Sequence, residues 1–329
     1  MRKLWLCILL WTGAAQAQVV PLPALRAQQV SVSGLSSGAY MAVQFEVAFS
    51  RTVIGAGIIA GGPYFCAQGS VFTATTTCSC NEELFSCRVR PGGTRVQNLI
   101  AITDWFAAMQ TIDPTSALAG HRIWMFSGTL DSVVPQAVSN DLLTYYRHYI
   151  DANRIAYKRN LAAEHAMPTD SYGNACSVLG SPYINNCNYD AAGELLNWIY
   201  GPLAARSASL AGRFIAFDQS EFIALPTWHG MADVGYLYIP PSCESGGGCR
   251  LHVAFHGCQQ SPDHIGAQFV RRAGYNAWAD NNRLLILYPQ TSATLANPKA
   301  CWDWWAHDDT RYAQKQAARW RPSSAWWTA

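Results

Sequence analysis

The chain has 329 residues, of which 50% are hydrophobic, 12% are aromatic and 13% are charged. Its formal net charge is +2, and removing the two basic residues at positions 2 and 3 from the 23 leaves 21, which equals the 21 acidic residues. A neutral chain has no basic surface for nucleic acid or for an anionic membrane, so we expect neither as a partner. The length and the apolar content suffice for one large α/β domain.

Residues 1–17 have the pattern of a secretory signal peptide. The basic pair Arg2-Lys3 precedes the apolar run Leu4 to Trp11, and Ala15-Gln16-Ala17 is a small-residue cleavage site. The apolar run is too short to span a bilayer, and no later segment is long and uniform enough to be an integral membrane helix. We therefore expect residues 18–329 to form a secreted, soluble protein of the extracellular space or the periplasm.

The next feature is the pentapeptide Gly34-Leu35-Ser36-Ser37-Gly38, which has the pattern of a nucleophile elbow. An alternating run, Gln29 to Ser33, precedes it, and the helix-like run Ala39 to Phe49 follows, so the strand-turn-helix context is present. Glycines flank the tip because neighbouring backbones approach it too closely for a Cβ. Ser36 is therefore the predicted nucleophile. Its position is early, because about half of a hydrolase sheet usually precedes this motif.

Buried strand-like runs then alternate with amphipathic helices, which predicts an α/β fold with a mostly parallel sheet and helices on both faces. Thr52 to Ala60 and His121 to Phe126 are expected strands, and Val96 to Ile112 is an expected helix. Asp131 follows the second strand, at the carboxyl edge where open α/β sheets place their sites. We predict Asp131 as the acid of a catalytic triad, the alternative being an N-cap for the helix that starts at Pro135.

His165 follows the run Leu161-Ala162-Ala163, which we interpret as the end of another strand. The order Ser36, Asp131, His165 is the hydrolase order of nucleophile, acid and base, so His165 is the predicted base. The remaining histidines have no matching strand-end position, and we expect them to be hydrogen-bonded structural residues.

A further strand, Arg250 to Phe255, leads into His256-Gly257-Cys258-Gln259-Gln260, and Leu284 to Tyr288 supplies another. The His-Gly loop resembles the loop that provides an oxyanion-hole amide in hydrolases, yet it lies more than 200 residues after the elbow. If the first half of a hydrolase sheet follows the second half in the sequence, the elbow, the His-Gly loop and these strands all take their usual places in the hydrolase fold. The α/β-hydrolase fold is therefore expected in a circularly permuted form, which closely spaced surface termini tolerate.

Ten of the eleven cysteines remain after the leader, an even number that points to disulfides in an exported chain. Three candidate pairs stand out: Cys176 with Cys187, Cys243 with Cys249, and Cys258 with Cys301. A cluster of four, Cys66, Cys78, Cys80 and Cys87, has three formal connectivities among which the sequence does not choose. A zinc site is the alternative for this cluster, but no histidine lies nearby and the destination is oxidising.

Three motifs together carry a family resemblance: Gly34 to Ala42, His256 to Gln260, and Cys301-Trp302-Asp303-Trp304-Trp305. In this order they resemble the circularly permuted, single-domain extracellular poly(3-hydroxybutyrate) depolymerases, from about Val30 to about Tyr312. The resemblance implies Ser36, Asp131 and His165 as the triad and the backbone amides of Ser37 and Cys258 as the oxyanion hole. It also implies a Cys258 to Cys301 disulfide, Trp305 at the substrate cleft, and polymer adsorption through surface apolar residues.

Trp304 and Trp305 are the candidate substrate-binding residues. The alternative is that the rings pack the loop tied by Cys301, which we adopt for Trp302 and leave open for Trp304. The chain departs from the family pattern at Ala306-His307, where members often have Gly-Tyr. Its tail, residues 313–329, is also atypical, because it ends where a longer amphipathic helix would cover the sheet.

The predicted activity is acyl transfer at an ester by a serine esterase that uses no metal and no organic cofactor. The expected substrate is an insoluble short-side-chain polyester or its oligomers, and the expected state is a monomer. Two alternatives keep the same fold: a secreted carboxylesterase for small or aromatic esters, and a non-catalytic binder of apolar surfaces. The 13 tryptophans favour apolar surface for a hydrophobic substrate, the alternative being that most of these rings are core.

Overall fold

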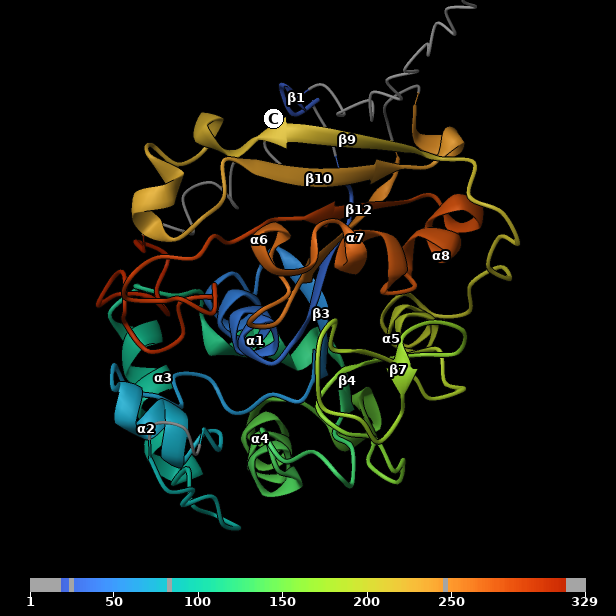
Figure 1. Ribbon diagram of the computed structural model, residues 1–329. Coiled ribbons are helices and arrows are strands. Elements are labelled where there is room, and N and C mark those ends of the chain that lie inside the picture. The colour runs from blue at the N-terminus through green and yellow to red at the C-terminus, as the bar shows by residue number, and fades with distance from the viewer. Residues whose placement is uncertain (1–18, 24–26, 82–84, 245–247, 318–329) are drawn as a thin grey trace, which may run out of the picture.

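A nine-stranded sheet crosses the part of the chain that the structure describes, in the order β1-β9-β10-β12-β11-β2-β3-β4-β5 (Figure 1). The strands from β12 to β5 in this order are all parallel, whereas β10 is antiparallel to both of its neighbours. The mostly parallel sheet predicted from the sequence is thereby confirmed. The strands are β1 (Val19–Val20), β2 (Val30–Leu35), β3 (Val53–Ile59), β4 (Arg122–Phe126), β5 (Ile155–Lys158), β9 (Arg213–Asp218), β10 (Val234–Ile239), β11 (Arg250–Phe255) and β12 (Leu284–Tyr288).

This computed structural model describes residues 19–23, 27–81, 85–244 and 248–317. The predicted signal peptide, residues 1–17, and residues 318–329 of the atypical tail lie outside the described residues. Among the helices of the described residues, none combines the length and the hydropathy that a membrane crossing requires.

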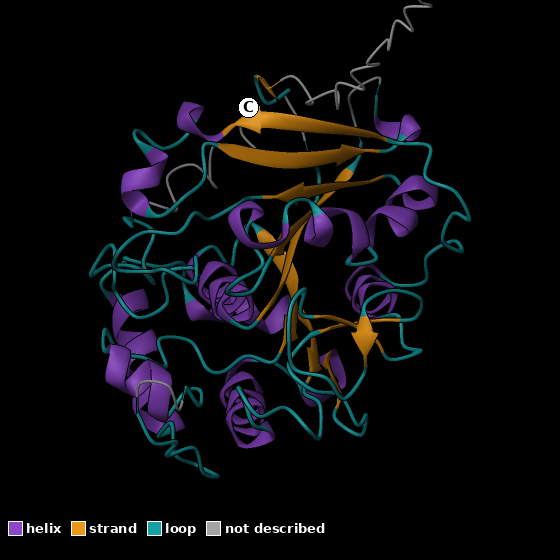
Figure 2. Cartoon of the chain, in the orientation of Figure 1, coloured by secondary structure: helices purple, strands orange, loops and turns teal. Residues whose placement is uncertain are grey.

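Helices cover both faces of the sheet, as the sequence predicts (Figure 2). One buried cluster joins the sheet to α1 and α3, through residues such as Phe45 and Phe106. A second cluster joins the sheet to α5 and α8, through residues such as Leu195 and Tyr275. The α-helices are α1 (Ser37–Ala48), α2 (Val71–Thr76), α3 (Val96–Ala108), α4 (Gln136–Tyr149), α5 (Ala191–Tyr200), α6 (Pro262–Ile265), α7 (Gln268–Arg272) and α8 (Tyr275–Asn282). Short 3-10 turns are η1 (Thr115–Gly120), η2 (Ala152–Arg154), η3 (Gln219–Glu221), η4 (Pro226–His229) and η5 (Pro241–Cys243).

A small second sheet, absent from the sequence-based prediction, lies between β5 and α5 along the chain. It contains β6 (Met167–Thr169), β8 (Ile184–Asn186) and β7 (Asn174–Ala175), in that spatial order. Strands of two or three residues are too short to show the alternation by which a strand is recognised in a sequence. The Cys176–Cys187 disulfide joins the residue directly after β7 to the residue directly after β8.

Helix α1 is buried on every side, because all 12 of its residues are buried. A surface helix has a polar face, so a helix without one must be covered by further chain. The ring of Tyr40 stacks on Trp304 with centroids 4.0 Å apart, and its hydroxyl donates to the carbonyl of Cys78. The cysteine-rich segment and the tryptophan loop therefore pack over the helix that follows the predicted nucleophile.

The central strand β2 lies between β11 and β3, so segments more than 200 residues apart are neighbours. Its register places Gly34 opposite Phe255, the last residue of β11. Both strands run in the same direction, so the turn after β2 and the loop after β11 emerge at one edge of the sheet. The predicted elbow and the predicted oxyanion loop are thus adjacent. The circular permutation stays an interpretation of this strand order.

Candidate active site

Ser36 lies at the turn between β2 and α1 and has the strained backbone that a nucleophile elbow requires. Its φ is 58° and its ψ is −123°, a region that residues with a side chain rarely adopt. The turn is held because the Ser36 N–H donates to the Ile59 carbonyl (3.0 Å) and the Ser36 carbonyl accepts from the Ala39 N–H (2.8 Å). Ser36 is half-buried between the buried residues Leu35 and Ser37.

The two glycines of the elbow have no room for a side chain. A Cβ built on Gly34 would lie 2.1 Å from the carbonyl oxygen of Gly38. A Cβ built on Gly38 would lie 2.3 Å from the carbonyl oxygen of His256 and 2.4 Å from that of Phe255. Real Cβ atoms do not approach backbone this closely, so glycine is required at both positions. The second contact also shows that the end of β11 packs directly on the elbow.

Asp131 and His165 form a buried hydrogen-bonded pair. The Nδ1 atom of His165 lies 3.0 Å from Oδ1 and 2.9 Å from Oδ2 of Asp131, and both side chains are almost fully buried. Oδ1 also accepts the N–H groups of Val133 (3.0 Å) and Val134 (2.7 Å). Because every partner donates, the carboxyl group acts as an acceptor and Nδ1 carries the imidazole proton. Asp131 is not a cap for α4, which starts later, at Gln136.

The expected strand at Leu161 to Ala163 is wrong. The edge strand of the sheet is β5, and His165 lies on a loop that follows it. This loop runs beside the loop of Asp131, because Thr129 N–H donates to the Leu161 carbonyl (2.9 Å) and Leu130 N–H donates to the Ala163 carbonyl (3.2 Å). Such pairing outside a regular strand explains why this apolar run, of which Ala163 is buried, was interpreted as a strand.

Glu164 is a second carboxylate at this junction, and no sequence pattern beyond its place next to His165 pointed to it. Its Oε2 atom accepts the N–H of Ser132 (3.3 Å) and the N–H of His165 (2.5 Å). Its own N–H donates to the carbonyl of Cys176 (2.9 Å). Glu164 therefore connects the loop of the predicted acid to the loop of the predicted base.

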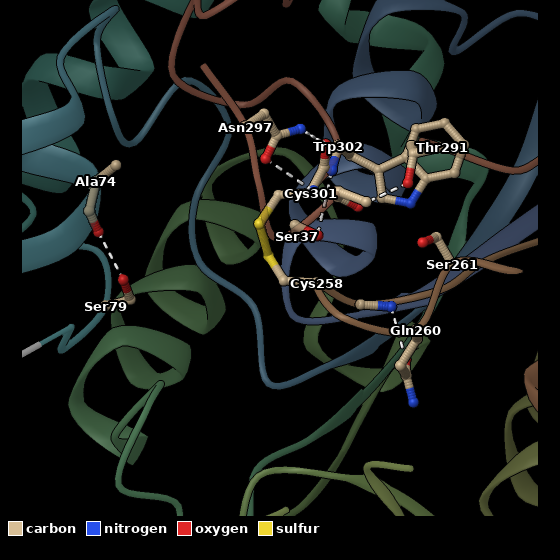
Figure 3. The surroundings of a disulfide bond; sticks show 12 residues. Ser37, Ala74, Ser79, Cys258, Gln260, Ser261, Thr291, Asn297, Cys301 and Trp302 are labelled. Carbon is tan, nitrogen blue, oxygen red and sulfur yellow. Dashed lines mark hydrogen bonds between the residues drawn. A yellow bond between two sulfur atoms is a disulfide. The ribbon is translucent and has the colours of Figure 1, made fainter. Parts of the chain in front are cut away.

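The loop after β11 places Cys258 against the elbow. A Cβ built on Gly257 would lie 3.4 Å from the Cβ of Ser36, so this loop and the serine are in contact. The Trp302 N–H donates to Oγ of Ser37 (3.3 Å), and Cys258 is bonded to Cys301 (Figure 3). The N–H groups of Ser37 and Cys258 donate no hydrogen bond to any residue within the described ranges. Two unused amides beside the serine are the donors that an oxyanion needs.

His256 braces this loop as a neutral imidazole. Its Nδ1 atom donates to the carbonyl of Gly257 (2.7 Å), and Nε2 accepts the N–H of Thr291 (3.3 Å). The Thr291 hydroxyl lies 3.2 Å from Nε2 and donates to the Ala300 carbonyl (2.6 Å). Burial lowers the pKa of His256 to about 4, so the ring is uncharged near neutral pH. It is a structural residue, as the sequence suggested for the histidines other than His165.

Two further histidines are buried away from Ser36. His252 bridges the hydroxyls of Ser31 and Ser33, each at 2.7 Å, and burial lowers its pKa to about 3. Burial alone would also lower the pKa of His121, but the hydrogen bond and charge of Glu46 outweigh it and raise that pKa. These groups stabilise the frame of the site rather than lie in it.

The three tryptophans of the last motif differ in exposure. Trp302 is 1% exposed and its Nε1 atom donates to the carbonyl of His256 (2.9 Å), so its ring is core, as expected. Trp304 is 7% exposed and stacked on Tyr40, which leaves it little surface for a substrate. This burial argues against the predicted substrate contact of Trp304. Trp305 is half-buried, with its ring 5.7 Å from that of Trp304 and 4.6 Å from that of His307.

The ten cysteines of the described residues form five disulfides. The three pairs proposed from the sequence are present: Cys176–Cys187, Cys243–Cys249 and Cys258–Cys301. In the four-cysteine cluster, Cys66 is bonded to Cys78 and Cys80 to Cys87. No thiolate of this cluster is free for a metal, so the zinc alternative is wrong.

Comparisons with known proteins agree on one family. No protein-family model matches the chain. The chain is 48% identical over 303 residues to a poly(3-hydroxybutyrate) depolymerase of Delftia acidovorans, which covers 90% of this chain and 58% of that protein. It is 40% identical over 319 residues to a polyhydroxybutyrate depolymerase of Talaromyces funiculosus, with 91% and 88% covered. The chain thus spans well under two thirds of the Delftia protein but most of the Talaromyces one.

Two solved structures are also similar. One is the crystal structure of the PHB depolymerase from Penicillium funiculosum, with a TM-score of 0.84, 36% identity, and coverage of 94% of this chain and 98% of that one. The other is a serine-to-alanine variant of PHB depolymerase in complex with an R3HB trimer, with a TM-score of 0.84, 35% identity and the same coverage.

Proposed function

The chain belongs to the poly(3-hydroxybutyrate) depolymerase family, and on that premise we propose that it is a secreted serine esterase that hydrolyses poly(3-hydroxybutyrate) or a similar short-side-chain polyester. The observation that carries this proposal is the buried pair of Asp131 and His165 in a chain that also has a strained serine at a nucleophile elbow. Fold alone would not identify an activity, whereas these three groups are the parts that acyl transfer uses.

In the proposed first step, Ser36 attacks the ester carbonyl. Nε2 of His165 takes the proton of the Ser36 hydroxyl as the bond from Oγ to the carbonyl carbon forms. The geometry of Asp131 supports this assignment, because its carboxylate holds Nδ1–H and leaves Nε2 as the basic nitrogen. The resulting imidazolium is stabilised by the same carboxylate, which two backbone N–H groups also hold in place.

The developing oxyanion is proposed to bind the N–H groups of Ser37 and Cys258. The Ser37 amide is in the first turn of α1, where backbone donors have no partner within the helix and where the helix dipole favours negative charge. The Cys258 amide lies on the loop that follows the neighbouring strand, β11, and the Cys258–Cys301 disulfide restrains it. One donor of this kind contributes roughly 3 to 4 kcal/mol to the stabilisation of a transition state.

The tetrahedral intermediate then collapses, and His165 returns its proton to the departing alkoxide. One part of the polyester leaves as an alcohol, while the other remains as an ester on Ser36. Water, deprotonated by His165, attacks this acyl-enzyme, and the serine leaves with the proton. The net reaction consumes one water and releases a hydroxyl end and a carboxylic acid end. Every step uses groups of the chain itself.

The proposed substrate is an insoluble polymer, and surface apolar residues support this choice. Leu225, Trp228 and Leu295 are among the exposed large apolar side chains, and Trp228 is 80% exposed. The loops that carry them are joined, because the Ser292 N–H donates to the carbonyl of Gly230 (3.0 Å). These exposed apolar side chains are the proposed points of contact with a solid polyester. Trp305, half-buried beside Trp304, is the proposed apolar wall of the substrate cleft.

Secretion is also part of the proposal. The five disulfides of the described residues fit an oxidising compartment, and residues 1–17 supply the predicted signal peptide. A single domain over residues 18–329, the circular permutation and the monomeric state stay predictions.

Labelling by an organophosphate tests the catalytic role of Ser36. The purified protein should gain one phosphoryl adduct, located on the Ser36 peptide by mass spectrometry, and lose its hydrolysis of a soluble nitrophenyl ester. Ser36→Ala should take up no label and show no turnover, with an unchanged melting temperature. A protein that stays unlabelled while it binds polymer would instead be the non-catalytic binder.

A further inference from the structure

Gln260 ends the His-Gly motif, and the proposed mechanism gives it no part. Its side chain is fully buried, at 0% exposure. Oε1 accepts the N–H of Gly257 (2.7 Å), and Nε2 donates to the carbonyls of Pro182 and Tyr183, each at 3.0 Å. All three partners are backbone groups with a fixed role, so the amide has one orientation only. Figure 3 shows Gln260 near the disulfide that holds Cys258.

The first bond acts on the peptide next to the one that carries the proposed oxyanion donor, because the Gly257 N–H belongs to the His256–Gly257 peptide. The carbonyl of Gly257 and the N–H of Cys258 belong to one trans peptide unit, so they point in opposite directions. The carbonyl accepts from Nδ1 of His256 (2.7 Å) and from the N–H of Gln260 (3.3 Å). Glycine has no intrinsic preference that would keep this peptide from turning over. The Gln260 side chain fixes the N–H of the preceding peptide, His256–Gly257, and so limits the rotation at Gly257 that would turn the next peptide over.

The second pair of bonds reaches the segment that follows His165. The Tyr183 carbonyl that accepts from Gln260 also accepts the N–H of Met167 (2.9 Å). Met167 is the first residue of β6 and lies two residues after His165. One buried side chain therefore connects the loop of the oxyanion donor to the loop of the base.

We propose that Gln260 is a positioning residue that orients the Gly257–Cys258 peptide so that its N–H faces the oxyanion, and that it fixes this loop relative to the loop of His165. The inference rests on the proposed function, since it assigns Gln260 to an oxyanion hole that acyl transfer needs. Gln260 touches no reacting atom in this role. Loss of the Gln260 side chain should impair transition-state binding more than substrate binding, because the ester carbonyl oxygen of the substrate gains its charge only in the transition state.

A purely structural role would predict a different result, and the chain offers a matched control. Asn282, at the end of α8, is also a buried amide: it accepts the Ala204 N–H (2.8 Å) and donates to the carbonyls of Ala204 (3.0 Å) and Trp278 (2.9 Å). It precedes the amino end of β12, whereas the elbow lies at the carboxyl edge of the sheet. Removing either amide takes one hydrogen-bond partner from each of three backbone groups, with a similar cost in stability.

The experiment compares Gln260→Met with Asn282→Leu, because both replacements preserve volume and remove the hydrogen bonds. For each variant and the unmodified protein, kcat and KM are measured on a soluble nitrophenyl ester, with the melting temperature and the inhibition constant of an alkyl boronic acid, whose adduct with serine resembles the tetrahedral intermediate. Gln260→Met should lower kcat roughly 10- to 100-fold, leave KM within about threefold, and weaken boronate binding by a factor similar to the loss in kcat. Asn282→Leu should lose thermal stability but keep kcat within about twofold.

Equal kcat values for the two variants at a matched loss of melting temperature would overturn the inference and leave Gln260 as a packing residue. If Gln260→Met does not fold, Gln260→Ala grown and assayed at low temperature replaces it, with the same expectations. Failure of the proposed function is distinguishable, because Ser36→Ala would then retain turnover. An inactive Ser36→Ala protein with a fully active Gln260→Met protein would contradict only the role of Gln260.

Discussion

Nδ1 of His165 lies 2.9 Å from Oδ2 of Asp131, although 34 positions separate the two residues in the chain. The two loops that carry them pair through backbone hydrogen bonds, and Glu164 adds a side-chain bridge between them. A pair built with this much support is held before any substrate arrives. Preorganisation of this kind is what lets a base and its acid act without rearrangement.

Asp131→Asn should lower turnover by roughly four orders of magnitude, the size of effect seen when a triad acid becomes an amide and the imidazole adopts the wrong tautomer. His165→Ala should be comparably damaging. Both are measured as kcat/KM on a soluble nitrophenyl ester. Asp151→Asn is the matched control, because Asp151 is exposed and lies before η2, and it should leave activity unchanged. Near-normal activity of Asp131→Asn would remove Asp131 from the triad.

Gly38→Ala should destabilise the protein and abolish most of its activity. The added Cβ would lie 2.3 Å from the carbonyl oxygen of His256, so α1 and the end of β11 would have to move apart at the place where the nucleophile meets the oxyanion loop. We expect a loss of about 1 to 3 kcal/mol in the free energy of unfolding, or more if the backbone cannot adjust. Urea unfolding and esterase assays measure the two effects.

Gly120→Ala is the control for this change, because a Cβ there meets no atom within 4 Å. It should be neutral or slightly stabilising, since alanine lowers the entropy of the unfolded chain. A Gly38→Ala protein as stable and active as Gly120→Ala would show that the elbow and the oxyanion loop are not held together as described.

The strands nearest the site were predictable from the sequence because they are buried on both faces. The predicted runs Arg250 to Phe255 and Leu284 to Tyr288 coincide with β11 and β12, each a mostly apolar segment of strand length. Ser36 was equally predictable from the sequence, since its motif depends on local backbone geometry. In each case the information lies in a few neighbouring residues.

The features that the sequence missed depend on distant contacts. Ala163 is buried by the loop of Asp131 and not by a strand of its own, so its apolar run gave a false strand. The burial of Trp304 depends on Tyr40, which lies on a helix far earlier in the chain. The side chain of Gln260 meets its two carbonyl partners, those of Pro182 and Tyr183, only when that distant segment folds beside it. Single-sequence patterns carry no record of such pairings.

Trp305→Ala should impair hydrolysis of polymer and oligomers much more than hydrolysis of a small acetate ester. The small ester occupies only the acyl site, whereas a chain needs the apolar wall beyond it. Trp304→Ala should instead lower the melting temperature, because its ring is stacked on Tyr40 inside the protein. Equal loss on both substrates in Trp305→Ala, with a lowered melting temperature, would make Trp305 a structural residue.

Stability should fall as the pH falls from about 6.5 toward 4, because His252 stays neutral in the folded state. Its folded pKa is about 3, below the value of about 6.5 expected in an unfolded chain, so the unfolded chain binds more protons in this range. One such group changes the free energy of unfolding by about 1.4 kcal/mol per pH unit, and His256, with a pKa of about 4, acts in the same direction.

His252→Gln should make this pH dependence shallower, while the stability near pH 7 falls through loss of the bonds to Ser31 and Ser33. Urea unfolding at several pH values measures both effects. An unchanged slope in His252→Gln would mean that the ring takes up protons in the folded state as easily as in water.

The most direct test of the account is the incubation of a poly(3-hydroxybutyrate) film with the purified protein and with its Ser36→Ala variant. The products in solution are identified by mass spectrometry. The account predicts that the unmodified protein erodes the film and releases 3-hydroxybutyrate or its short oligomers, and that Ser36→Ala releases none while it still adsorbs to the film. An intact film beside rapid hydrolysis of a soluble nitrophenyl ester would contradict the proposed function and identify a small-ester carboxylesterase.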